Sequence, residues 1–116
     1  MPELQAHPRT LDRVFDAIAD TTRRSILERL RAGPMTVTAI AHPYSMSFNA
    51  VSKHVKKLED AGLIRRKISG REHFCHLNAA RLEPAVTWMN HYQQFWTSRL
   101  DALEEHLIRT KERSKK

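Results

Sequence analysis

Cationic side chains gather in one short segment of the chain, between residues 47 and 71. This segment holds seven cations and only two acids, Glu59 and Asp60, so it carries +5 of the net charge of +7. A solvated surface normally mixes its signs, whereas a surface of one sign is typical of proteins that neutralise phosphates. The pattern predicts contact with a nucleic-acid backbone; the alternative is a lysine-rich surface that only aids solubility. The seven cations are Lys53, Lys56, Lys57, Arg65, Arg66, Lys67 and Arg71.

The first half of this segment predicts a helix with one basic face. Ser47 can cap its amino end, and Gly62 can close it. Val51, Val55 and Leu58 recur at spacings of four and three, which places them together on a buried face. The opposite face then carries short polar groups followed by cations: Asn49, Ser52, Lys53, Lys56 and Lys57.

The second half of the segment predicts a β-hairpin. Leu63 to Ile68 and Glu72 to Leu77 are rich in Ile, Leu, Phe and Cys, and Ser69-Gly70-Arg71 forms the turn between them. Gly70 supplies the positive φ that a tight hairpin needs. A helix that can enter a major groove, followed by a ribbon tipped with arginine, is the arrangement of a winged helix-turn-helix. We therefore expect binding to double-stranded DNA.

Three shorter helices are expected before the basic helix. Leu11 to Ala19 has one apolar stripe, Asp20 can cap a helix over Thr21 to Arg31, and Thr36 can cap a short helix over Val37 to Ala41. Pro43 then starts the turn. A short helix, a tight turn and a basic helix give the helix-turn-helix order. The predicted fold class is mainly α (α+β), a winged helix-turn-helix with a long C-terminal dimerisation helix.

The last helix is expected over residues 81–109, with apolar residues on two adjacent stripes. One stripe is a heptad seam with a single polar member, Gln93, and the other runs through Ala85, Trp88, Tyr92 and Phe95. One small domain needs only one stripe to cover its core, so the second predicts a homodimer. The alternative is a single broad core face. The predicted dimer interface is Leu82, Val86, Met89, Trp96, Leu100, Leu103 and Leu107.

Composition places these elements in one domain. A chain of 116 residues is long enough for a single core, expected over 11–109, with a flexible N-terminus at 1–10 and a basic flexible tail at 110–116. It has no apolar run near the roughly 20 residues of a membrane span and no secretion pattern, so we expect no membrane partner. One cysteine fits a reducing cytoplasm.

Several spaced motifs resemble the ArsR family of bacterial repressors. They are FDAIADTTRRSILERL, the V-S-x-H-V-x-x-L-x-x-A-G-L-I spacing from Val51 to Ile64, and the turn Gly70-Arg71. The resemblance covers roughly residues 11–107 and implies a homodimeric repressor that binds a palindromic operator. It also implies that Phe48, Asn49, Ser52 and Lys53 read bases. Phe48 departs from the polar residue usual at its position and could instead contact a thymine methyl group.

The expected DNA-binding residues extend from the helix cap to the turn of the hairpin. His54 could either bond a phosphate or brace the helix, and the Tyr44 hydroxyl could either serve the turn or reach a phosphate. The alternative function is a winged module that docks a protein and has no DNA role. The DNA-binding set is Ser47, Phe48, Asn49, Ser52, Lys53, His54, Lys56, Lys57, Arg65, Arg66, Lys67 and Arg71.

We expect neither a metal site nor a cofactor. Members of the resembling family often bind a metal through paired cysteines before the basic helix, where this chain reads TVTAIAHPY. His91 and His106 are fifteen residues apart, too far for one subunit to bring to one ion.

Cys75 is expected to be a small buried apolar residue. Three glycines and no local nucleophile–base arrangement argue against an enzyme. The sequence does not identify a small-molecule or metal effector.

Overall fold

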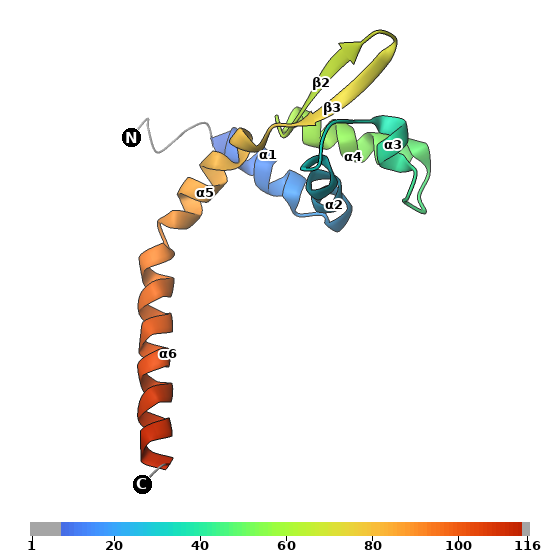
Figure 1. Cartoon of the computed structure of the whole chain (residues 1–116). Coiled ribbons are helices and arrows are strands. Elements are labelled where there is room, and N and C mark those ends of the chain that lie inside the picture. Colours follow the sequence, from blue (N-terminus) through green and yellow to red (C-terminus); the bar gives the residue numbers. More distant parts are fainter. Residues whose placement is uncertain (1–7, 115–116) are drawn as a thin grey trace. The chain divides into compact units, whose positions relative to one another are not determined.

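Helices α1 to α4 and a small sheet form most of the first of two units in the computed structural model (Figure 1), which describes residues 8–114. The two units are Met1–Ala85 and Val86–Lys116. Helices α1 (Pro8–Ile18) and α2 (Thr21–Leu30) precede α3 (Val37–Ala41) and α4 (Phe48–Asp60). The predicted order of a short helix, a turn and a basic helix is confirmed.

Each of the three predicted amino-terminal caps is formed. The Asp20 carboxylate accepts a hydrogen bond from the Arg23 backbone N–H at 3.0 Å. The hydroxyl of Thr36 accepts one from Ala39 N–H at 3.1 Å, and that of Ser47 accepts one from Ala50 N–H at 3.1 Å. These bonds satisfy donors that the first helical turn leaves free, so the caps define where α2, α3 and α4 begin.

The core of the first unit lies between the inner faces of α1 to α4 and one side of the sheet. Helix α2 contributes Ile26, Leu27 and Leu30, as predicted from its periodicity. Helix α4 contributes the predicted face of Val51, Val55 and Leu58, each fully buried. The remaining buried apolar residues are Val14, Ala17, Ile40, Ala61, Leu63, Ile64, Cys75 and Ala85.

The sheet has three strands in the order β1-β3-β2. Strands β2 (Ile64–Ser69) and β3 (Glu72–Leu77) form the predicted antiparallel hairpin, with Ser69 opposite Glu72 and Gly70 at φ 65° in the turn. Figure 1 shows this hairpin extending beyond the helices of its unit. The two-residue strand β1 (Met35–Thr36) pairs with β3 and was not predicted, because two residues carry no periodic signal.

The C-terminal segment is not the single helix predicted over residues 81–109. A 3-10 turn, η2 (Ala79–Leu82), leads into α5 (Glu83–Asn90), and α6 (Gln93–Ser114) follows after a break. The N–H groups of His91 and Tyr92 bond back three residues, to Trp88 and Met89, instead of four. Asn, His and Tyr are all weak helix formers, and three of them in succession favour this tightened end.

Helix bounds at both ends of the chain also differ from the prediction. Helix α6 continues to Ser114, so 110–114 are helical where a flexible tail was expected. Helix α1 begins at Pro8, inside the expected flexible segment 1–10. The rest of that segment, 1–7, and the last two residues of the chain lie outside the described residues. No helix within residues 8–114 is long and apolar enough to cross a membrane.

The two apolar stripes of the C-terminal segment are mostly exposed. Leu82 is partly buried and packs against the core of the first unit, and its place in a dimer interface stays a prediction. The second stripe is buried only at Ala85, whereas Trp88, Tyr92 and Phe95 are about half exposed. The exposed members of the predicted seam are Val86, Met89, Trp96, Leu100, Leu103 and Leu107.

Candidate nucleic-acid interface

The outer face of α4 is the polar surface that the sequence predicted. Because Val51, Val55 and Leu58 are buried, the residues between them must point away from the core. Asn49 and Lys53 are exposed, Ser52 is half-buried, and Lys56 and Lys57 follow along the same helix. Phe48 begins the helix with 52% of its side chain exposed. Donors, acceptors and one aromatic ring thus stand together at the amino end of a capped helix.

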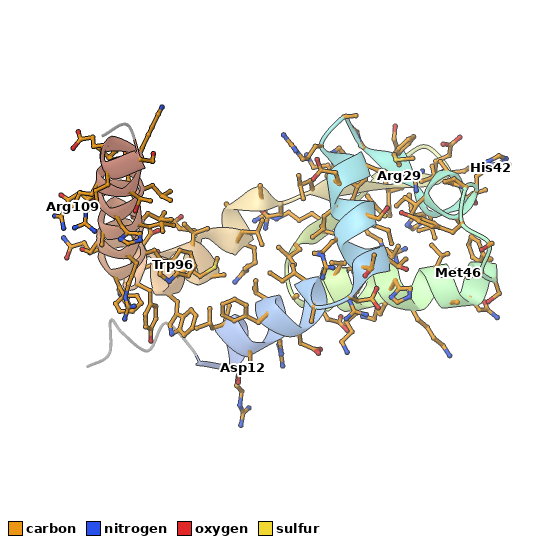
Figure 2. All side chains as sticks on the ribbon, turned by 90° about the horizontal axis from the view of Figure 1, so that it is seen from below. Asp12, Arg29, His42, Met46, Trp96 and Arg109 are labelled. Carbon is orange, nitrogen blue, oxygen red and sulfur yellow. The ribbon has the colours of Figure 1, made fainter. Side chains whose placement is uncertain are left out.

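Arg29 of α2 holds the turn that orients α4. Its guanidinium donates hydrogen bonds to the carbonyls of Ile40 (2.7 Å) and Ala39 (3.2 Å) at the end of α3. It also lies over the Tyr44 ring, 5.2 Å from the centroid. In Figure 2 Arg29 lies on the side of α2 that faces α3. These contacts satisfy carbonyls that the short helix leaves free and fix its position on α2.

The Tyr44 hydroxyl is already engaged within the protein. It lies 2.7 Å from the Ser25 hydroxyl on α2. Of the two roles considered for Tyr44, the structure therefore supports turn chemistry. No sequence pattern marked Ser25 or Arg29, because each acts on a residue ten or more positions away.

His54 braces α4 against the first two helices. Its Nδ1 lies 3.2 Å from a guanidinium nitrogen of Arg23 and 3.8 Å from a carboxylate oxygen of Asp20. Arg23 in turn donates to the carbonyls of Ala17 (2.7 Å) and Asp16 (2.9 Å) at the end of α1. The hydrogen bond from the Arg23 backbone keeps the pKa of Asp20 below its ordinary value. The bracing role of His54 is thus visible, while a phosphate contact remains a prediction.

Three of the seven clustered cations form ion pairs within the chain. Lys56 pairs with Asp60 at 2.8 Å, and Arg66 pairs with Glu59 at 3.1 Å. The third pair joins Lys57 on α4 to an acid on α1. Hydrogen bonding to Asp60 raises the pKa of Lys56. The two acids counted in the segment are therefore both used locally.

The other four cations have no ion-pair partner within residues 8–114. Lys53 is on the outer face of α4, Arg65 and Lys67 are exposed on β2, and Arg71 is exposed at the turn. This unpaired charge runs from the outer face of α4 along the hairpin. Unpaired cations release counterions on meeting a phosphate backbone, whereas paired ones must first exchange a partner.

The described residues contain no group of three or more His, Cys, Asp or Glu side chains that could hold a metal ion. Cys75 is fully buried in the middle strand, and burial raises the pKa of its thiol. Such a thiol is mostly protonated and poorly reactive at neutral pH.

Comparisons with known proteins agree with this architecture. A helix-turn-helix domain family model matches residues 18–67, from the end of α1 into β2. The chain is 37% identical over 92 residues to the HTH-type transcriptional regulator Rv2034 of Mycobacterium tuberculosis, covering 79% of this chain and 83% of that one. It is 35% identical over 79 residues to the transcriptional repressor SdpR of Bacillus subtilis, covering 68% and 88%.

Comparison with solved structures also finds transcriptional regulators. The crystal structure of the ArsR family transcriptional regulator RHA00566 superposes with a TM-score of 0.71 at 37% identity, over 79% of this chain and 95% of that one. This chain belongs to the ArsR family. The homodimeric winged helix-turn-helix DNA-binding domain of Mb0332 from Mycobacterium bovis, a possible family member, superposes with a TM-score of 0.58 at 26% identity, over 74% and 82%.

Membership in the ArsR family gives the class of protein to which this chain belongs. The family consists of DNA-binding transcriptional regulators and not of enzymes. In this ArsR-family chain α3 and α4 are the helix-turn-helix, and β2 and β3 are the wing.

Proposed function

We propose that this chain is a homodimeric repressor that binds a palindromic operator through α4 and the wing. The observation that carries the proposal is the capped amino end of α4 with its exposed polar groups, together with four exposed cations on α4 and the wing that form no ion pair within residues 8–114. An α-helix fits the major groove of B-DNA, where each base pair presents its own pattern of donors and acceptors. The amino-terminal residues of a recognition helix are the ones that reach base edges.

We assign base reading to the first turns of α4 and backbone contact to the wing. The side-chain amide of Asn49 can form two hydrogen bonds with the edge of an adenine, and the ammonium group of Lys53 can donate hydrogen bonds to a guanine. Ser52 is half-buried beside them. The unpaired cations Arg65, Lys67 and Arg71 suit phosphate contact because they are exposed on β2 and the turn. Lys56, Lys57 and Arg66 contribute less, since each already has an acidic partner.

The partner chain is proposed to be a second copy, joined through the C-terminal helices. In α6, Trp96, Leu100, Leu103 and Leu107 are each more than half exposed. A monomer seldom leaves so long an apolar stripe in water. The Mb0332 domain, which this chain resembles, is homodimeric, and this supports pairing with a second copy. A two-fold protein suits an inverted repeat, because its two recognition helices then meet equivalent half-sites.

Repression and a cytoplasmic location complete the proposal. The similarity to a protein named a transcriptional repressor supports repression over activation. A regulator that acts on a bacterial chromosome works in the cytoplasm, and the buried reduced thiol of Cys75 is compatible with that compartment.

The proposal is tested by selecting duplexes from a random pool with the full chain and sequencing them. We expect enrichment of an inverted repeat whose half-sites are about 10 base pairs apart, or a multiple of that spacing. The Asn49→Ala variant should bind the selected site about 5-fold to 150-fold more weakly, a loss of roughly 1–3 kcal/mol, with little change on random DNA. Equal losses on both DNAs would remove Asn49 from base reading. No enrichment and no salt-dependent binding would favour a protein-docking module.

A further inference from the structure

Phe48 is an apolar side chain in a polar neighbourhood. Within residues 8–85 two large apolar side chains are exposed, Phe48 at 52% and Ile68 at 69%. Single exposed apolar residues are common on proteins, so exposure alone is not informative. The informative feature is position, because Phe48 is the first residue of α4 and Ile68 is near the tip of the wing.

The first turn of α4 fixes where the Phe48 ring stands. Ser47 caps the helix through its bond to Ala50 N–H, so the backbone at Phe48 is held in helical geometry. Phe48 and Ser52 are four residues apart, so their side chains are neighbours on adjacent turns of the helix. The ring therefore stands beside Ser52, at the edge of the face that carries Val51 and Val55, and its side chain is 52% exposed there.

The chemistry of a phenyl ring limits what it can recognise among base edges. It has no hydrogen-bond donor or acceptor, so it cannot use the polar groups that bases present in the major groove. The apolar group that a standard base offers there is the C5-methyl of thymine. A ring seated against any other base would remove water from polar base atoms without replacing their hydrogen bonds.

We infer that Phe48 is a specificity-determining residue that recognises the methyl group of one thymine in each half-site. This inference rests on the proposed function, in which α4 lies in the major groove. Asn49 and Lys53 then select bases through hydrogen bonds, while Phe48 selects thymine through apolar contact. The two-fold assembly repeats the contact once in each half of the operator.

The test replaces thymine by uracil, which lacks only the methyl group. The probe is the inverted repeat selected by the full chain, synthesised with deoxyuridine in place of thymidine at one position at a time, symmetrically in both half-sites. Removing one methyl contact should weaken binding about four-fold per half-site, or about fifteen-fold for both. We expect one thymine position near the amino end of α4 to show this loss, and the others to show little.

The matched variants separate a specific contact from general weakening. Phe48→Ala should bind the thymine and uracil probes equally at that position, because the ring that senses the methyl group is gone. Ile68→Ala removes an even more exposed apolar side chain from the wing and should keep the full difference. A thermal melt of each variant verifies folding, and Phe48→Leu, which keeps an apolar contact, should retain part of the discrimination.

The outcomes distinguish this inference from the proposed function. If a repeat is selected but no uracil substitution weakens binding, or if Phe48→Ala keeps the difference, Phe48 is not a thymine reader and the proposed function stands. If no sequence is selected at all, the proposed function fails and this inference fails with it.

Discussion

The ammonium nitrogen of Lys57 on α4 lies 2.8 Å from a carboxylate oxygen of Asp16 on α1. The hydrogen bond from Lys57 lowers the pKa of Asp16, so the acid is charged at neutral pH. Both side chains are about half exposed, and an exposed pair of this kind contributes little to folding. Its main consequence concerns DNA, because Lys57 cannot neutralise a phosphate fully while Asp16 holds it.

The Asp16→Asn variant should therefore bind random-sequence DNA more tightly than the unmodified chain. Releasing Lys57 for one more phosphate contact should steepen the plot of log affinity against log salt by up to about one unit. Affinity at several salt concentrations measures this. Asp12→Asn is the control, since it removes the same charge from an exposed acid of α1 that forms no ion pair within residues 8–114. Equal slopes for both variants would mean that Lys57 stays off the backbone.

The wing offers a second comparison between an unpaired and a paired arginine. Arg71→Ala should weaken binding to all sequences to a similar extent and flatten the salt slope by about one unit. Arg66→Ala should flatten it less, because Arg66 is already paired with Glu59 at 3.1 Å. An unchanged slope for Arg71→Ala would place the wing turn outside the interface.

A charge in the apolar stripe of α6 should separate the proposed dimer. Leu100→Glu places a carboxylate where the partner helix is proposed to pack, which costs several kcal/mol unless the helices part. Sedimentation at micromolar concentration should then give a monomer with most operator affinity lost. Ser98→Glu adds the same charge on roughly the opposite side of α6 and should remain dimeric. A monomeric unmodified chain would rule out the interface without any variant.

The cap of α2 should make stability depend on pH below the ordinary carboxyl range. Asp20→Ala should destabilise the chain by about 1 kcal/mol at neutral pH, through loss of the bond to Arg23 N–H. The pKa of Asp20 is lowered from 3.8 in the folded state, so the unfolded state binds a proton more readily. The charged cap therefore stabilises fully above 3.8, and this contribution disappears as pH falls through the folded-state pKa.

Asp20→Asn is the matched variant for that pH dependence. Asparagine caps helices about as well as aspartate but does not titrate. Urea unfolding at neutral pH should give nearly equal stabilities for the two chains, and the acid-induced loss should be smaller in Asp20→Asn. Identical acid profiles would assign the loss to other carboxylates.

Sequence-based reasoning succeeded where the deciding interaction is local. The caps at Asp20, Thr36 and Ser47 depend on a bond to a residue three positions ahead, and each was predicted. Gly70 was predicted from the turn it forms. Gly62 was predicted as a helix end, and the structure adds a second reason: a Cβ there would lie 2.6 Å from Arg81 Nε.

The same reasoning failed where distant residues decide. The spacings of the heptad pattern do not change on either side of His91. The periodicity of the sequence therefore could not show that the helix breaks between α5 and α6. Nor could it show that Arg29 would reach the end of α3, or that Lys57 would meet Asp16. Counting charges placed the basic surface correctly but overstated the free cations, because pairing depends on how helices pack.

Strand β1 ties the wing to the helix-turn-helix at a second point. It lies directly before α3 and pairs Met35 with Cys75 of the middle strand, while only three residues, Ala61, Gly62 and Leu63, separate α4 from β2. The wing is thus fastened at both of its strands and is not a free arm. If α4 and Arg71 contact DNA as proposed, the fold fixes the distance between these two contacts. A half-site lengthened by one base pair between those contacts must deform or give up one of them.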